Sequence, residues 1–133
     1  MDDELQHLTG EMDLGAGASR ERLAEVGRQL GASFPPDYLA FMIATNGGEG
    51  PVGEDGYGAV YPIEELSEAN RAYADFEHFE GLVIFGSDMG GEAFCFDAEG
   101  SVVMVEYISE REANVLIGSF ADFMRRLGDG RLL

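Results

Sequence analysis

Apolar residues recur at helical spacing early in the chain. Leu23, Val26 and Leu30 fall on one face of a helix. Ser19 precedes this face and can cap the helix, because its hydroxyl can accept a hydrogen bond from a backbone N–H of the first turn. Gly31 suits the left-handed conformation in which helices end. The pattern predicts one helix between Ser19 and Gly31.

A second helix is predicted over residues 36–45. Pro36 suits the first helical position, where its missing N–H would have no partner. Asn46 and Gly47 then supply a left-handed stop that most residues resist. The apolar face is broad, which is typical of a helix packed on a sheet, and it contains Tyr38, Leu39, Phe41, Met42 and Ile43.

Short strands follow in the second half of the chain. We predict an edge strand over residues 59–62 and a helix over residues 63–74. Glu64, Glu65 and Glu68 lie near the beginning of this helix, where acidic residues favour the positive end of the helix dipole. The unbroken apolar run 82–85 predicts a central strand covered on both faces. Residues 93–97 and 101–107 flank a short glycine-containing loop and predict an antiparallel hairpin.

The last predicted helix begins after Ser119, which forms a capping-box pattern with Asp122. Gly128 ends it. Its apolar face contains Phe120, Phe123, Met124 and Leu127. Two segments lack a sustained pattern. We predict that residues 1–18 form a flexible arm or a short loose helix outside a domain of residues 19–133, and that the glycine-rich residues 47–58 form an irregular surface loop suited to binding.

Length and composition favour one cytoplasmic domain. The 133 residues leave little room for a second core, and no apolar run approaches the ~20 residues that a bilayer span needs. The acidic first residues lack the basic region and the apolar core of a signal peptide. The lone Cys95 lies in an apolar alternation, so we expect a buried thiol rather than a disulfide or a reactive group.

Three motifs together resemble the SUKH superfamily, which includes fungal cell-wall regulators and many bacterial immunity proteins. They are FPPDYLAFMIATNGG at residues 34–48, GLVIFGSDMGGEAFCFDAEG at 81–100 and SFADFMRRLG at 119–128. The resemblance runs from about Ser19 to Gly128, and Phe34 stands where a leucine is usual. It implies a single compact α+β domain, a mostly antiparallel sheet with helices packed on one face. The predicted elements independently support that layering.

Charge is the second strong signal. The chain has 26 acidic and 8 basic residues, all of the latter arginine, for a net charge of −18. Between Asn46 and Tyr107 the only basic residue is Arg71. Such a field repels nucleic acids and anionic lipids and attracts basic proteins. An acidic surface also serves solubility alone, and the sequence leaves that alternative open.

Residues with catalytic potential form no recognisable arrangement. His7 and His78 lie in the arm and between elements, and Ser87, His78 and Asp88 lack a nucleophile-elbow pattern. One cysteine and two distant histidines do not give zinc spacing, the EF-hand pattern is absent, and a chain without lysine cannot form a P-loop. We therefore predict no enzyme, no metal and no cofactor.

The resemblance implies a protein that binds and neutralises a cognate toxin domain, often a nuclease, inside the producing cell. A nuclease displays basic residues where phosphates bind, so an acidic surface can cover that site. We expect this surface on the two glycine-rich loops, at Glu49, Glu54, Asp55, Asp88 and Glu92. The alternatives are a regulatory scaffold, as the fungal relatives imply, and a small-molecule sensor whose pocket is lined by Tyr38, Tyr57 and Tyr61.

Overall fold

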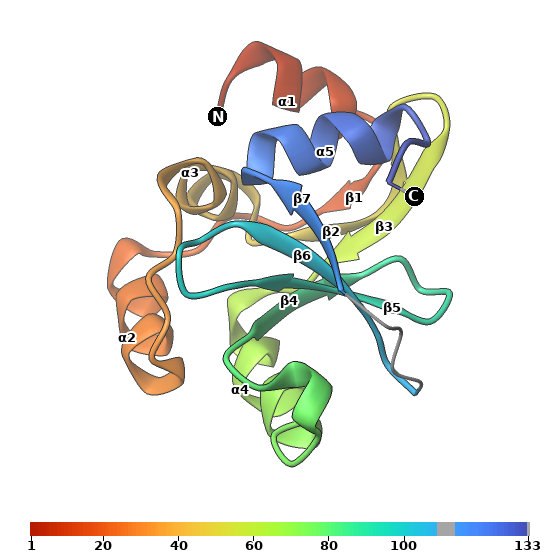
Figure 1. Cartoon of the computed structure of the whole chain (residues 1–133). Coiled ribbons are helices and arrows are strands. Elements are labelled where there is room, and N and C mark those ends of the chain that lie inside the picture. The colour runs from red at the N-terminus through yellow and green to blue at the C-terminus, as the bar shows by residue number, and fades with distance from the viewer. Residues whose placement is uncertain (109–113, 133) are drawn as a thin grey trace.

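The computed structural model describes residues 1–108 and 114–132 and shows a single α+β domain (Figure 1). Five α-helices pack against an antiparallel sheet of seven strands. This arrangement confirms the predicted fold class. The elements in chain order are α1 (Asp3–Leu8), β1 (Asp13–Leu14), α2 (Arg20–Leu30), α3 (Pro36–Thr45), β2 (Gly48–Val52), β3 (Gly56–Val60), α4 (Ile63–Ala72), the 3₁₀ helix η1 (Glu77–Phe79), β4 (Val83–Ser87), β5 (Glu92–Phe96), β6 (Val102–Glu106), β7 (Val115–Gly118) and α5 (Phe120–Gly128).

The strands lie side by side in chain order, from β1 to β7. Each pairs antiparallel with the next, so the sheet is a meander in which short connections suffice between most neighbours. The predicted hairpin is confirmed, with Phe94 opposite Met104 at its centre. β7 is an element that the sequence pattern did not predict. It pairs with β6 and leads directly into α5.

The larger core lies between the sheet and helices α1, α3 and α5, and buried residues of α2 and α4 also belong to it. Successive strand residues point to opposite faces, so Phe94 and Phe96 enter this core while Cys95 points away from it. Phe85 and Phe96 stack with ring centroids 4.2 Å apart. Tyr38 presents its ring edge to Phe96 at 4.9 Å. Aromatic contacts of this kind bind helices of both chain halves to the central strands.

A smaller apolar cluster covers part of the opposite face. It contains Phe79, Ile84, Ala93, Cys95, Val103 and Val105, with Tyr73 and Tyr107 packed against it. The segment between α4 and β4 contains η1, and Phe79 of η1 packs in this cluster. The prediction that Cys95 is a buried core residue is confirmed. Burial raises the pKa of its thiol, which opposes formation of the reactive thiolate.

The glycine-rich segment 47–58 forms strands β2 and β3, so the prediction of an irregular loop there is wrong. Gly53 takes a positive φ of 58° in the turn between these strands, and other glycines of the segment are needed for close packing. A Cβ at Gly56 would overlap the backbone carbonyl of Leu127 in α5, and one at Gly47 would overlap that of Val60. Glycine therefore lets the hairpin lie directly against α5, at the cost of the usual strand propensity.

The first 18 residues contain the short helix that was one of the two predictions, but they pack against the domain instead of forming a loose arm. They form α1 and β1; α1 packs beside α5, and β1 pairs with β2 (Figure 1). Leu5 and Met12 are buried in the larger core. Glu4 forms an ion pair with Arg125 of α5 at 2.9 Å. Helical spacing is present in Leu5, Leu8 and Met12, but too briefly to indicate an element without its tertiary partner.

The joint between α3 and β2 depends on Asn46. This residue adopts the left-handed conformation, with φ 52°, and ends α3 as predicted. Its side-chain oxygen accepts a hydrogen bond from the Ile63 backbone N–H at 2.9 Å, and its amide donates to the Glu64 carboxylate at 2.9 Å. Asn46 thus caps α4 from a distance, since Pro62 at the cap position of α4 gives no side-chain bond.

Asp37 joins the beginnings of two helices in a similar way. One carboxylate oxygen accepts from the Tyr38 N–H at 2.9 Å in α3. The other accepts from the Ala121 N–H at 2.9 Å in α5, 84 residues away. A negative group is favourable at both positions, because the helix dipoles are positive at their N-terminal ends. Ser119 caps α5 by accepting from the Asp122 N–H, so the predicted capping residue is confirmed.

Replacing Asn46 tests the joint. Asn46→Ala removes the cap of α4 and places a Cβ-bearing residue without a compensating amide in the left-handed region, so we expect a loss of about 2 kcal/mol in the free energy of unfolding. Asn46→Gly keeps the backbone conformation and loses only the side chain, with an expected loss of about 1 kcal/mol. Urea denaturation monitored by circular dichroism measures both. Equal stability of the wild-type protein and both variants would contradict the proposed role of the joint.

Replacing Asp37 tests the bond between α3 and α5. Asp37→Ala leaves the Ala121 N–H without its acceptor, and we expect the free energy of unfolding to fall by about 1–2 kcal/mol. Asp37→Asn retains one oxygen acceptor, so its free energy of unfolding should fall by less. Asp75→Ala, in the exposed turn after α4, serves as the control and should change stability by less than about 0.5 kcal/mol. Thermal and urea unfolding of the three variants would disprove the bridging role if Asp37→Ala behaves like the control.

Candidate functional site

Two adjoining hollows form a groove along α4 and the sheet face that carries the smaller apolar cluster. One has a volume of about 620 Å³ and the other about 510 Å³. Both are lined by Tyr61, Glu65 and Met89, so they are continuous. We call them together the acidic groove. The first is also lined by Glu68, Ala69, Ala72, Tyr73, Ser87, Gly91 and Tyr107, and the second by Asp13, Leu14, Gly15, Asn46, Gly47, Gly48, Glu49, Ala59, Val60 and Pro62.

One wall of the groove is a face of α4. Glu65, Glu68, Ala69 and Ala72 follow one another at steps of three, one and three residues, so they lie on the same side of the helix. Ile63 and Leu66 are buried on the other side, which fixes the rotation of the helix. The two alanines leave space above the sheet, and the two exposed glutamates place their carboxylates along its rim.

The floor is formed by three tyrosines, each directly after an element: Tyr61 after β3, Tyr73 after α4 and Tyr107 after β6. The hydroxyl oxygens of Tyr61 and Tyr107 lie 3.2 Å apart and share a hydrogen bond. The Tyr73 ring packs on the Tyr107 ring with centroids 4.8 Å apart. Burial and the bond to Tyr61 raise the pKa of the Tyr107 hydroxyl, so this group stays neutral at physiological pH. The groove therefore has an aromatic floor with neutral hydroxyls between acidic walls.

The lip of the groove is the loop between β4 and β5. Asp88 organises it, because one of its oxygens accepts from the N–H groups of Gly90 at 2.7 Å and of Glu92 at 3.0 Å. The Ser87 hydroxyl donates to the Glu92 carbonyl and accepts from the Met89 N–H, both at 2.9 Å. Met89 adopts a positive φ of 64° and is 56% exposed. The loop thus holds an apolar side chain outward at the edge of the groove.

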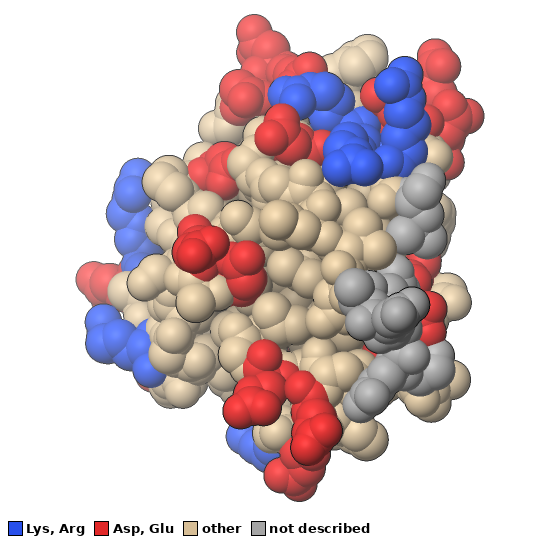
Figure 2. Space-filling view, viewed as in Figure 1, with Lys and Arg blue, Asp and Glu red and all other residues tan. Residues whose placement is uncertain are grey.

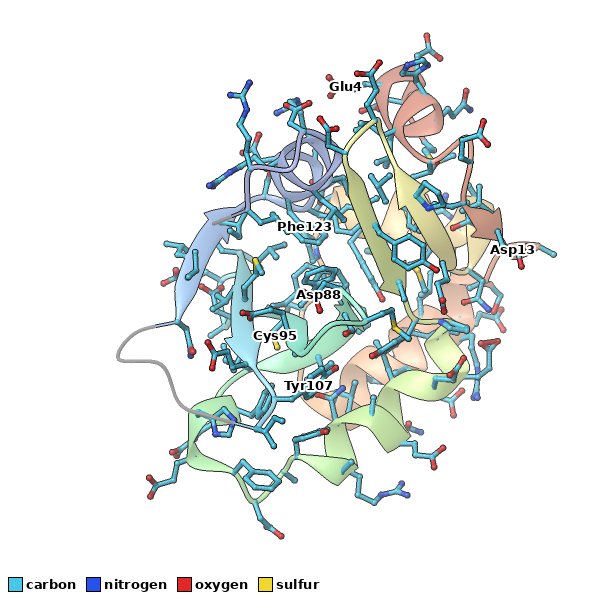
Figure 3. The ribbon with its side chains drawn as sticks, turned by 90° about the vertical axis from the view of Figure 1, so that its right-hand side faces the viewer. Glu4, Asp13, Asp88, Cys95, Tyr107 and Phe123 are labelled. Atoms are coloured by element: carbon cyan, nitrogen blue, oxygen red, sulfur yellow. The ribbon has the colours of Figure 1, made fainter. Side chains whose placement is uncertain are left out.

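The structure separates the five acidic residues that the sequence analysis proposed. Glu49 lines the groove, and its carboxylate accepts from the Tyr57 hydroxyl at 3.1 Å, which raises the pKa of that hydroxyl. Asp88 lies in the lip, and Glu92 begins β5 opposite Glu106. In Figure 3, Asp13 marks one end of the groove and Tyr107 the other, with the loop of Asp88 above Tyr107.

Glu54 and Asp55 lie elsewhere, in the turn between β2 and β3. The turn is fixed between two helices, since the Gly53 N–H donates to the Leu8 carbonyl at 2.8 Å and the Asp55 N–H to the Gly128 carbonyl at 3.0 Å. The last turn of α5 carries two arginines, so the field of these two acids is partly offset locally. Neither residue lines the groove.

Three acidic residues of the groove were not in the proposed set. Glu65 and Glu68 were recognised in the sequence only as favourable for the helix dipole. The helical spacing of these glutamates with Ala69 and Ala72 is the signal that could have identified them. Asp13 was assigned to the arm, and only the pairing of β1 with Glu49 of β2 brings it to the groove.

Charge is distributed unevenly over the surface. No arginine lines either hollow of the groove within the described part of the chain. Figure 2 shows basic residues over α2 at the left and, among acidic ones, over α5 at the top, with mainly acidic residues at the bottom, over the region of α4 and η1. The groove is thus electronegative, and a cation meets no local competitor there.

The hydroxyl and imidazole groups near the groove have structural contacts. Both hydrogen bonds of the Ser87 hydroxyl go to backbone groups, and a His78 ring nitrogen lies 3.2 Å from the Tyr107 carbonyl oxygen. No group of three or more potential metal ligands occurs among the residues described. The three tyrosines proposed for a sensor pocket do not share one, because Tyr38 is fully buried in the larger core and Tyr57 is exposed on β3.

Within residues 1–108 and 114–132, every helix is too short or too polar to pass through a bilayer. Comparison with curated protein sequences finds no significant match. The sequence model of the SMI1 / KNR4 family (SUKH-1) matches residues 17–126, which include α2, α3, α4, all strands of the sheet from β2 onward and most of α5. The chain therefore belongs to the SMI1 / KNR4 family (SUKH-1).

Proposed function

We propose that this domain is a non-catalytic protein-binding module that acts as an immunity protein. Its partner is a basic toxin domain, such as a nuclease, which it binds through the acidic groove in the cytoplasm of the producing cell. The observation that carries the proposal is the concentration of Asp13, Glu49, Glu65 and Glu68 in one groove that no arginine lines in the described structure. Membership of the family is consistent with this function.

The net charge supports a basic partner. At −18, the chain attracts cationic proteins over distances comparable with the Debye length, about 8 Å at physiological salt. Opposite charge accelerates the encounter of two proteins more than it strengthens the final complex. Fast capture suits an inhibitor that must act before its target reaches a substrate. Nucleic acid carries the same sign of charge as the groove and is disfavoured as a ligand.

The groove has the chemistry to receive lysine or arginine side chains. The rings of Tyr61, Tyr73 and Tyr107 offer apolar surface for the stem of such a side chain, and an exposed ring face can make a cation–π contact with its charged end. Glu65 and Glu68 then stand beside the cationic group. Cationic residues bind phosphates in a nuclease site, so residues held in this groove would be withdrawn from substrate.

The acids outside the groove extend the proposed contact surface. Asp88 and Glu92 lie at the lip, while Glu54 and Asp55 lie at the β2–β3 turn. The lip and the turn are at the same end of the sheet, because β3 and β4 are antiparallel and Ala59 pairs with Ser87. Figure 1 shows both on the right-hand side of the molecule. A partner that covers this side would contact the groove first and these flanking acids at its periphery.

A salt-dependent pull-down tests the proposal. Tagged protein is used as bait in the native cell extract at low and high salt, and co-purifying proteins are identified by mass spectrometry. We expect one basic toxin-like domain, retained less at high salt because screening weakens its attraction to the groove. Recovery of a regulatory protein would instead support the scaffold alternative. Recovery of no basic protein at either salt would contradict the proposal.

Charge variants locate the contact. Glu49→Gln, Glu65→Gln and Glu68→Gln together should weaken binding of the recovered partner at least about tenfold, because its cations lose their counter-charges. The matched control carries Glu21→Gln, Glu99→Gln and Asp129→Asn, three exposed acids that line neither hollow of the groove. It has the same change in net charge and should bind within about threefold of wild type. Equal losses in both variants would show a general field effect and no contact at the groove.

A second variant examines the five acids that the sequence analysis proposed, of which Glu49 lines the groove and the other four lie outside it. It neutralises Glu49, Glu54, Asp55, Asp88 and Glu92 to their amides, and Asn at position 88 still offers the oxygen that holds the lip. We expect affinity for the basic partner to fall further at low salt than at high salt, because these charges act partly through screened attraction. Isothermal titration calorimetry at two salt concentrations measures the effect. Unchanged affinity in this variant would show that these acidic residues are not part of the contact surface.

A further inference from the structure

A separate hollow of about 420 Å³ lies between α2 and α3. Its apolar lining includes Leu23 of α2, Phe34 of the connection, and Leu39 and Ile43 of α3. Leu23 is buried, whereas the other three side chains are only partly covered and present apolar surface to the opening. The hollow shares no lining residue with the acidic groove, so its occupancy does not depend on the proposed function.

The charge of this hollow is opposite to that of the chain. Arg20 and Arg28 line it, and no aspartate or glutamate does. In a chain with 26 acidic and 8 basic residues, a site with two arginines and no acid is a marked local reversal. Figure 2 shows the basic residues of this region at the left of the molecule, where Figure 1 places α2.

Both arginines are available for a ligand. In the described part of the chain, neither Arg20 nor Arg28 forms an ion pair, in contrast to Arg22, which lies 3.6 Å from Glu25 on the same helix. Eight residues separate Arg20 from Arg28, about 12 Å along an α-helix, so they stand towards opposite ends of the hollow. An anionic group therefore meets an unpaired guanidinium at either end.

We propose that this hollow binds a small amphiphilic anion. Its apolar chain or ring system packs against Leu23, Phe34, Leu39 and Ile43, and its carboxylate or sulfonate pairs with Arg20 or Arg28. The volume matches that of small-molecule sites, about 300–1,000 Å³. Apolar area with a few placed polar groups is the usual composition of such sites, and the arginines select a negative group over a neutral one.

Fluorescence titration with 1-anilinonaphthalene-8-sulfonate, an apolar anion, tests the site, and decanoate serves as the competing ligand. With wild-type protein at low salt, we expect the fluorescence of the dye to rise to saturation and decanoate to displace the dye. Arg20→Gln with Arg28→Gln should weaken both ligands about tenfold, since a charge-assisted contact is lost. The control, Arg22→Gln with Arg71→Gln, removes the same charge from residues that do not line the hollow and should bind within about twofold of wild type.

Ala24→Trp provides a test without a charge change. Ala24 is exposed on α2 and lines the hollow, so the larger side chain should fill the opening and abolish binding without unfolding the protein. Cooperative thermal unfolding of each variant shows that the dye reports a folded state. The proposal is overturned by equal affinity of wild type and the Arg20/Arg28 variant, by full binding to a folded Ala24→Trp protein, or by absence of saturable binding of both ligands to wild type.

Discussion

The side chain of Asn46 connects the parts of the molecule on which the groove depends. Its backbone ends α3, its oxygen caps α4 at Ile63, and its amide holds Glu64. The next residue must be glycine, because a Cβ at Gly47 would overlap the Val60 carbonyl. One short motif therefore sets the position of α4 relative to β2 and β3. The wall and the floor of the acidic groove follow from that placement.

Opposite charges are concentrated in different parts of the same small domain. The acids of α4 and β2 surround a groove with a tyrosine floor, whereas the arginines of α2 border an apolar hollow between two helices. Arg125 of α5 instead has a structural role, since it forms ion pairs with Glu4 and Asp122. A net charge of −18 alone would describe a uniform acidic surface. The tertiary structure resolves it into two surfaces suited to ligands of opposite sign.

Local signals predicted the helices well and the site in part. Ser19, Ser119, Gly31 and Asn46 were recognised as helix ends because a cap depends on the few residues beside it. The glycines of β2 and β3 indicated a loop, because the flexibility of glycine is a local property. The reason for glycine at position 56 is instead the nearby carbonyl of Leu127, which is distant in sequence and visible only in the folded structure. Glu49 was found by its charge; Glu65 and Glu68 were assigned only to the helix dipole.

The sequence by itself determined the α+β class, the family, the four longer helices, the β5–β6 hairpin and the strongly acidic surface. Each of these depends on periodicity, on adjacent residues or on composition. Only the tertiary structure decided that Asp13 meets Glu49, that Asp37 reaches Ala121 and that Tyr61 meets Tyr107. These contacts join residues 36 to 84 positions apart. Their formation depends on strand order and helix placement, which no local stretch of sequence specifies.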